Sequence, residues 1–166
     1  FQKAYNPYDF SGLRACEARV WSFFRTFDKS MDKYKKHIMG DASEEPMPLY
    51  IIPDRKVSLA DVREGMRNHY EGTELSMTND PGAGVYKVPY RWRPMTFKSE
   101  GREYFNERAI ATQQTGFVLI AQMRSWLPDA VGGILWFGVD DANTAVLTPM
   151  YTSITEIPEC YRRGNG

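Results

Sequence analysis

The chain has 166 residues, of which 42% are hydrophobic and 25% charged, and its 21 basic side chains balance 21 acidic ones. A chain of this length buries roughly 70% of its unfolded surface, so a core can hold it together without metal or disulfide staples. Zero formal net charge gives no electrostatic footprint for nucleic acid or an anionic membrane. We therefore expect residues 1–166 to form a single domain with no nucleic-acid or membrane partner.

The two cysteines, Cys16 and Cys160, are too far apart in the sequence for a CxxC metal or redox motif. Cys is among the most buried residue types, which favours two free, buried thiols. One long-range disulfide is the alternative.

Two segments show apolar residues at helical spacing. The first runs from residue 11 to 28, and its apolar residues are Leu13, Cys16, Val20, Trp21, Phe24 and Phe27. The second begins at Ser58, where residues 58–61 have the form of a capping box, and its pattern continues to Gly72. Between them we expect a charged helix end and surface loop, then a short strand or extended loop at residues 49–52.

A long loop over residues 72–102 separates the helical part from the rest of the chain. Loops of this length in a compact domain are usually functional or disordered. The loop carries four aromatic residues, namely Tyr86, Tyr90, Trp92 and Phe97. This aromatic content predicts that the loop packs against the body of the protein and shapes a site.

The second part of the sequence has strand character. Four segments rich in β-branched and aromatic residues are separated by turn residues, and they lie at residues 105–114, 117–124, 133–140 and 144–154. We interpret them as four sequential antiparallel strands. Helices followed by a strand meander predict an α+β layered domain.

Several catalytic signatures are missing from the sequence: it contains no GxSxG, HExxH or Walker motif. The two histidines, His37 and His69, lie far apart, so neither a histidine-based triad nor a zinc site is expected. The turn at residues 78–81 can present the Asn79 amide outward as a hydrogen-bond donor, although a plain turn is the alternative.

Arg108 is the second candidate site residue. In the predicted strand it would lie near the interior of a sheet, where a buried guanidinium needs carboxylate or carbonyl partners. A structural ion pair with Glu107 or Asp140 is the alternative to a role at a site.

Three collinear runs of this sequence resemble the cysteine dipeptidases of the dipeptidase A type. They are YFNERAIATQQTGF at 104–117, QMRSWLP at 122–128 and GGILWFGVDDAN at 132–143. The opening GLRACEARVW at 12–21 and the closing IPECY at 157–161 resemble the same family. The resemblance therefore covers nearly the whole chain.

This resemblance implies an N-terminal-nucleophile hydrolase with an αββα sandwich. In that superfamily the thiolate of an amino-terminal Cys attacks the scissile carbonyl, its own α-amino group serves as base, and no metal or cofactor is required. Residues 78–81 are similar to a turn whose asparagine helps to form the oxyanion hole, which gives Asn79 that role. Arg108 is similar to the strand arginine that lies near the nucleophile and favours its reactive state.

The sequence departs from the family at the nucleophile. Residue 1 is Phe, and neither Cys16 nor Cys160 combines a thiol with a free amino group. We therefore expect the central portion of a larger bacterial dipeptidase that is inactive alone and exposes an apolar face. Its expected partners are short peptides and the remainder of the parent chain, and the sequence is compatible with homo-oligomers. We expect the parent protein to be cytoplasmic or exported.

Two other functions fit the same sequence. One is a linear-amide acylase of the same superfamily, which would act on acyl-amides instead of dipeptides. The other is a non-catalytic module for peptide binding or assembly that uses the aromatic loop between Tyr86 and Phe97.

Overall fold

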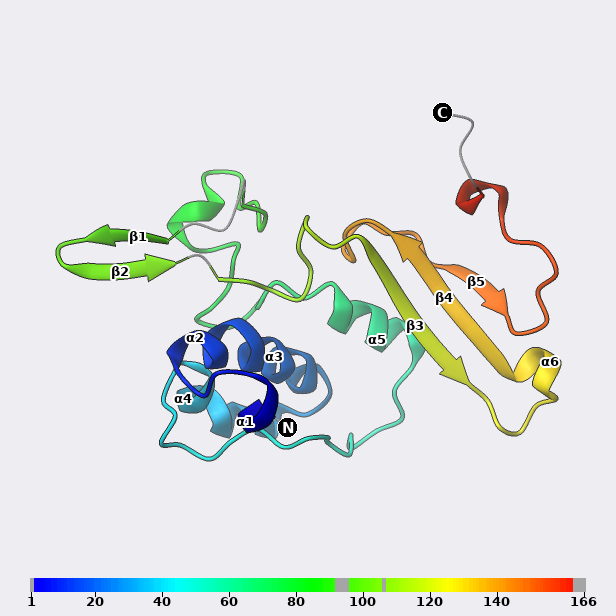
Figure 1. The fold of residues 1–166 in the computed structure, drawn as a ribbon, viewed down its shortest axis with the longest axis horizontal. Helices are drawn as coiled ribbons and strands as arrows, with labels where there is room; N and C mark the ends of the chain where they lie inside the picture. The colour runs from blue at the N-terminus through cyan, green and yellow to red at the C-terminus, as the bar shows by residue number, and fades with distance from the viewer. Residues whose placement is uncertain (1, 92–95, 106, 163–166) are drawn as a thin grey trace. The chain divides into compact units, whose positions relative to one another are not determined.

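The computed structural model describes residues 2–91, 96–105 and 107–162. The chain divides into two compact units, residues 1–113 and 114–166, which are described separately below (Figure 1). The first unit contains most of the helices and one hairpin, and the second contains a small sheet with two short helical turns, so the α+β prediction is confirmed. Whether the units form the single expected domain stays a prediction. In the described part of the chain, no helix is long and apolar enough to cross a membrane.

The first predicted helix is confirmed as one continuous helical segment. It consists of α2 (Phe10–Gly12), the π-helical turn η1 (Leu13–Glu17) and α3 (Ala18–Phe27), preceded by the short α1 (Gln2–Tyr5). The Asp9 side chain accepts a hydrogen bond from the Gly12 amide at 3.0 Å, which satisfies a free amide at the helix start. The helix ends at Asp28, whose backbone is extended.

The charged stretch after this helix is helical rather than a simple loop. It forms η2 (Lys29–Tyr34) and α4 (Lys35–Ile38), after which residues 49–52 are irregular and form no strand. The predicted second helix is α5 (Leu59–Met66), and its capping box joins the Ser58 and Asp61 side chains to each other's backbone amides. The helix ends six residues before Gly72 because Arg67 leaves the helical conformation.

The core of the first unit joins the long helix to the loop that follows α5. Its buried members are Ala18, Trp21, Met31, Tyr34, Ile38, Tyr70, Leu75, Met77 and Ala109. The Trp21 indole donates to the Met31 carbonyl at 2.8 Å, so its polar group is satisfied within the core. The aromatic residues of the long helix therefore serve packing.

A β-hairpin forms at the end of the predicted long loop, before the first predicted strand, so the prediction of a loop was wrong for that part. Strand β1 (Thr96–Ser99) pairs with β2 (Arg102–Phe105), and the turn residues Glu100 and Gly101 both have positive φ, at 50° and 74°. The prediction of a strand over residues 105–114 was wrong, because residues 107–113 are irregular. Their backbone bonds to the preceding loop instead, as when the Ala111 amide donates to the Asn68 carbonyl at 3.2 Å.

The second unit is a three-stranded antiparallel sheet. Its elements are β3 (Phe117–Met123), α6 (Asp129–Gly132), β4 (Gly133–Val139), β5 (Thr148–Tyr151) and η4 (Glu159–Tyr161), with strand order β3-β4-β5. The register aligns Leu119 with Phe137. These three predicted strands are confirmed, although β5 is shorter than its predicted range.

The sheet of the second unit has two different faces. Val118, Ile120 and Ile134 are buried on one face, because the pleat of a strand sends alternate side chains to opposite sides. Apolar side chains on the other face are exposed, among them Phe117, Leu119, Met123 and Val139.

Both cysteines are free, as predicted, but they are not both buried. Cys16 is half-buried in the long helix, whereas Cys160 is exposed in η4. The expectation of a buried thiol was therefore wrong for Cys160, which lies in a short terminal turn with little packing around it.

The fully buried His37 makes the stability of the first unit depend on pH. Its Nε2 lies 3.7 Å from Glu17 Oε2, its ring faces Tyr8, and the carboxylates of Asp41 and Glu44 lie nearby. Burial lowers the pKa of His37 below its usual 6.5 and raises the pKa of Glu17. As pH falls below about 6.5, the unfolded chain binds a proton that the folded chain does not, so stability falls.

We expect the free energy of unfolding, measured by urea denaturation, to fall between pH 7 and pH 5.5 by up to about 1.4 kcal/mol per pH unit. His37→Gln should remove the contribution of His37 to this slope, because the variant side chain does not titrate. The half-buried Glu17 acts in the opposite sense, since its raised pKa favours the protonated folded state as pH falls. An identical slope in the variant would show that His37 is not its source.

Candidate active site

The turn that carries Asn79 is the first part of the candidate site. The backbone N–H of Asn79 donates to the Ser76 carbonyl at 3.3 Å, and the Ser76 and Thr78 hydroxyls are hydrogen-bonded to each other at 3.0 Å. Asp80 caps the short helix η3 (Pro81–Ala83), and its side chain accepts from the Ala83 amide at 3.0 Å. The Asn79 side chain is exposed, so its amide is accessible to a ligand.

A buried arginine holds this turn. Arg91 is 9% exposed, and its guanidinium donates to the carbonyls of Met77 and Val88, each at 2.9 Å, and of Tyr90 at 3.1 Å. It also forms an ion pair with Asp80. An arginine has five N–H donors in a fixed planar arrangement, so one side chain can satisfy several oxygens at once.

Tyr70 connects the core to the second candidate segment. Its side chain is fully buried, and its hydroxyl donates to the Arg108 carbonyl at 2.9 Å. Its backbone has φ of 66°, a left-handed conformation that costs a residue other than glycine about 1 kcal/mol. Side chains next to it support this conformation: Asn68 Oδ1 accepts from the Tyr70 amide at 2.8 Å, and the Thr73 hydroxyl donates to the Tyr70 carbonyl at 2.7 Å.

His69 and Glu71 form a pair that the sequence analysis missed. Glu71 Oε1 lies 3.1 Å from His69 Nδ1, and Glu71 Oε2 accepts from the His69 amide at 2.7 Å. Burial alone would raise the pKa of Glu71, but these hydrogen bonds outweigh it and the pKa is lowered. The His69 ring is buried and packs edge-on against Tyr90 at 5.6 Å between centroids. The sequence signal for this pair was the i, i+2 spacing of His69 and Glu71 beside Gly72, and that spacing alone is too common to predict a site.

Arg108 does not occupy the buried strand position that the sequence suggested. Its side chain is exposed and its backbone is irregular, because β2 ends at Phe105. Of the two partners considered for an alternative ion pair, Glu107 is wrong, since it pairs with Arg14 of the long helix. Burial raises the pKa of Glu107, although the Arg14 guanidinium favours its charged form.

The two predicted site residues lie on segments that are tied to one scaffold. Arg91 holds the Asn79 turn, Tyr70 holds the Arg108 backbone, and the Gln113 side-chain amide donates to the Arg91 carbonyl. The structure therefore places both residues in the first unit on connected loops. A role for either residue in a reaction stays a prediction.

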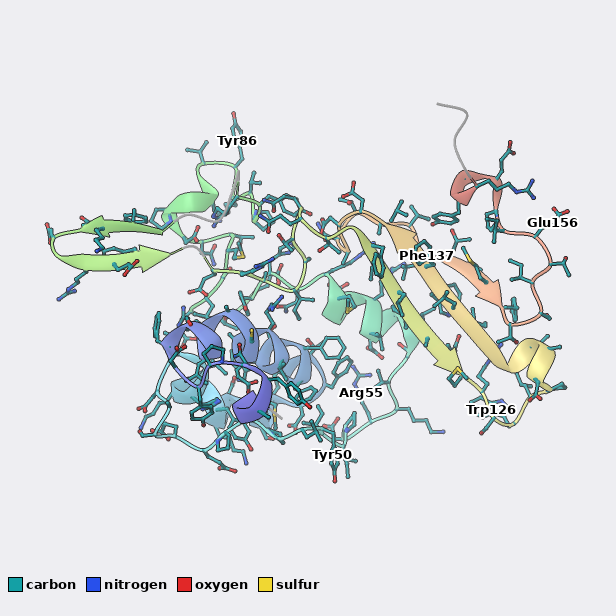
Figure 2. All side chains as sticks on the ribbon, viewed as in Figure 1. Tyr50, Arg55, Tyr86, Trp126, Phe137 and Glu156 are labelled. Carbon is teal, nitrogen blue, oxygen red and sulfur yellow. The ribbon has the colours of Figure 1, made fainter. Side chains whose placement is uncertain are left out.

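The aromatic loop only partly matches its prediction. Tyr90 packs against His69, but Tyr86 is 88% exposed and projects away from the ribbon (Figure 2). Phe97 stacks on Tyr104 within the hairpin, with ring centroids 5.2 Å apart. Trp92 lies outside the described residues. The expectation that the loop packs against the body of the protein was wrong at Tyr86, whose ring is exposed to solvent.

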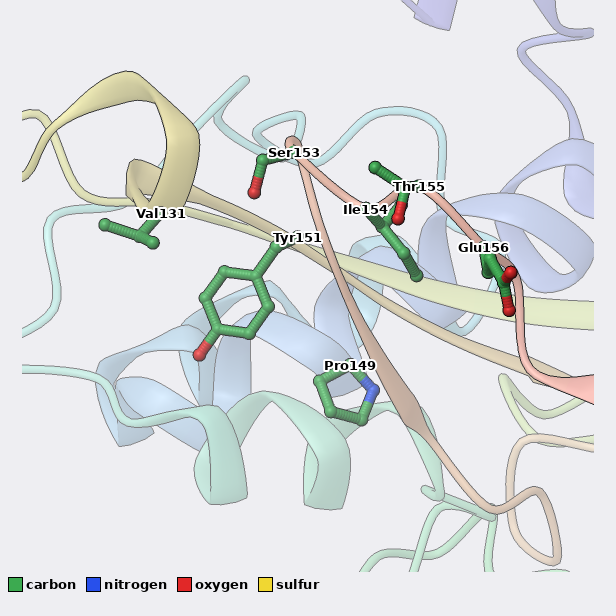
Figure 3. A pocket seen from close by; sticks show the side chains of 7 residues that line it. All are labelled: Val131, Pro149, Tyr151, Ser153, Ile154, Thr155 and Glu156. Carbon is green, nitrogen blue, oxygen red and sulfur yellow. The ribbon is translucent and has the colours of Figure 1, made fainter.

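Two hollows in the described part of the chain, one in each unit, are lined by residues other than Asn79 and Arg108. In the second unit a hollow of about 490 Å³ is lined by Val131, Pro149, Tyr151, Ser153, Ile154, Thr155 and Glu156 (Figure 3). In the first unit an apolar hollow of about 560 Å³ is lined by Cys16, Arg19, Val20, Phe23, Phe24, Met66 and Ile110. Among the described residues, no three His, Cys, Asp or Glu side chains lie close enough to hold a metal ion.

The chain belongs to peptidase family C69, whose model matches residues 1–166. It is 27% identical over 172 residues to a protein named "Probable dipeptidase B" from Lactococcus lactis subsp. lactis (strain IL1403), a match that covers 100% of this chain and 31% of that protein. It is 26% identical over 151 residues to a "Probable dipeptidase" from Salmonella dublin, covering 91% of this chain and 29% of that protein.

A further relative is "Dipeptidase A" of Lactobacillus helveticus, which is 22% identical over 146 residues, covering 87% of this chain and 25% of the relative. The chain thus spans about a third or less of the length of these relatives. No solved structure gives a significant match.

Loss of the Tyr70 hydroxyl should destabilise the first unit. Tyr70→Phe leaves the Arg108 carbonyl without its donor, and we expect the free energy of unfolding to fall by about 1–2 kcal/mol. Urea unfolding followed by circular dichroism measures the change. Tyr86→Phe is the matched control, because that exposed hydroxyl should contribute nothing measurable. Equal midpoints for the two variants would contradict the assigned hydrogen bond.

Proposed function

We propose that this chain is part of a cysteine-type dipeptidase that hydrolyses the peptide bond of dipeptides. The observation that carries the proposal is the match to peptidase family C69 along the whole chain, together with relatives that are named as dipeptidases. Short peptides and the remainder of the parent chain are the partners this function requires. The complete fold we propose is the αββα sandwich of N-terminal-nucleophile hydrolases.

The nucleophile in this proposal is an amino-terminal Cys outside the present chain. Its thiol proton passes to its own α-amino group as the sulfur attacks the scissile carbonyl, and the carbonyl oxygen becomes an oxyanion. Collapse of this intermediate breaks the C–N bond, releases the second amino acid with the proton, and leaves a thioester. Water then attacks the thioester and releases the first amino acid, which restores the thiol.

Asn79 would donate a hydrogen bond from its side-chain amide to the oxyanion. The exposed side chain and the fixed turn support this role, because a donor held in place before the reaction stabilises developing charge at little reorganisation cost. Arg108 would lie near the thiol and favour the thiolate through its positive charge. The Tyr70 hydrogen bond fixes the backbone of Arg108 while its exposed side chain remains accessible.

Replacing Asn79 by Ala should slow dipeptide hydrolysis by about a hundredfold to a thousandfold, the usual loss for one oxyanion donor. The measurement is kcat on a dipeptide, using a dipeptidase that contains this chain. Val85→Ala is the control, because Val85 lies in the same loop and is 90% exposed. Unchanged turnover in Asn79→Ala would remove Asn79 from the site, and cleavage of acyl-amides in preference to dipeptides would favour an acylase instead.

The 166-residue chain alone should not hydrolyse dipeptides. Cys16 lies inside the π-helical turn and Cys160 in η4, so neither thiol has a free α-amino group of its own residue beside it. Product formation from a dipeptide can be followed before and after the thiols are alkylated. Hydrolysis that is present at first and lost on alkylation would show that one of these two thiols acts as nucleophile.

A further inference from the structure

One buried guanidinium holds the chain on both sides of Asn79. Arg91 Nη2 donates to the Met77 carbonyl at 2.9 Å and to Asp80 Oδ1, so it bonds the chain two residues before Asn79 and one residue after it. The same Asp80 oxygen accepts from the Ala83 amide at 3.0 Å. The two flanks of the turn therefore share a single anchor.

We propose that Arg91 is a positioning residue that fixes the Asn79 amide in the orientation needed to bind an oxyanion. This inference rests on the proposed function of Asn79. An exposed asparagine on an unsupported turn would adopt several orientations, and binding an oxyanion would then require the turn to become ordered during the reaction. A turn that is already held spares that reorganisation.

The set of oxygens that Arg91 bonds supports this role. All four belong to the loop between residues 77 and 90: the carbonyls of Met77, Val88 and Tyr90, and the carboxylate of Asp80. The guanidinium thus organises the loop internally. Buried ion pairs are weak evidence for stability, because apolar replacements of similar size are often tolerated. Holding the loop in one geometry accounts for the charge better than stability does.

Gly82 gives an independent observation of the same arrangement. A Cβ atom added at Gly82 would lie 2.6 Å from Arg91 Nε and 3.1 Å from its Cζ, so the Gly82 backbone lies directly against the guanidinium. Gly82→Ala therefore displaces the guanidinium while every polar group of the loop remains present. The substitution perturbs the geometry of the turn and leaves its charges intact.

The experiment measures kcat and KM on a dipeptide for Arg91→Met, Arg91→Lys and Gly82→Ala in a dipeptidase that contains this chain. We expect kcat to fall by about a hundredfold in Arg91→Met, the loss typical of a small misplacement of a reacting group. KM should change little, because the interaction is made in the transition state. Lys offers a compact charge without the planar arrangement of donors and should not rescue the rate.

Arg55→Met is the matched control. Arg55 forms an exposed ion pair with Asp61 in the same unit, at 2.9 Å, and lies outside the loop of residues 77–90. Its kcat should equal that of the unsubstituted enzyme. If Arg91→Met does not fold, Gly82→Ala and Arg91→Lys carry the test, with melting temperatures recorded for each.

A double variant separates positioning from a general structural role. If Arg91 acts through Asn79, adding Arg91→Met to Asn79→Ala should slow turnover no further, because the amide that Arg91 positions is already gone. Additive losses in kcat would overturn the proposal. So would full activity in both Arg91→Met and Gly82→Ala while Asn79→Ala is slow, and the role of Asn79 would then stand. Full activity in Asn79→Ala would instead remove the oxyanion role proposed for Asn79, on which this inference rests, while the dipeptidase function would stand.

Discussion

The hydrogen bond from the buried Tyr70 hydroxyl to the Arg108 carbonyl is the interaction on which the first unit depends. Tyr70 belongs to the apolar core together with Trp21 and Ile38, so its ring is fixed by packing. The hydroxyl must find a partner inside the protein because water is excluded there. That partner is the Arg108 carbonyl, which lies 38 residues further along the chain in an irregular segment. The core thereby fixes the position of a segment that forms no strand.

Arg91 also fixes irregular backbone through hydrogen bonds, but it does so in the loop of residues 77–90 rather than from the core. Tyr70 joins the core to residues 107–113, whereas Arg91 joins parts of the 77–90 loop to one another. The Gln113 side chain donates to the Arg91 carbonyl and so connects the segment of residues 107–113 to Arg91. The exposed side chains of Asn79 and Arg108 therefore extend from loops whose backbones are tied to buried groups, an arrangement that suits a site assembled on loops.

Sequence patterns predicted the elements whose signals are local. The apolar spacing from Leu13 to Phe27 gave the long helix, residues 58–61 gave the capping box, and three of the four strands were located correctly. The segment at residues 105–114 failed because its alternating pattern resembles a strand, while its backbone bonds to the 68–91 loop. Those partners are distant in sequence, so no local pattern encodes them. The His69–Glu71 pair and the hydrogen bonds of Arg91 were not predicted for the same reason. Both depend on burial and on contacts that form only when the loop folds.

The choice of a guanidinium to hold the Asn79 turn has a consequence for work in acid. Three of the four oxygens that this guanidinium bonds are backbone carbonyls, which do not titrate, so most of the anchor does not depend on the ionisation of another side chain. The core of the same unit contains a buried imidazole, His37, whose protonation opposes folding. His37 is therefore a group of the first unit whose burial opposes folding in acid. Engineering for use at low pH would begin at His37 and leave Arg91 in place.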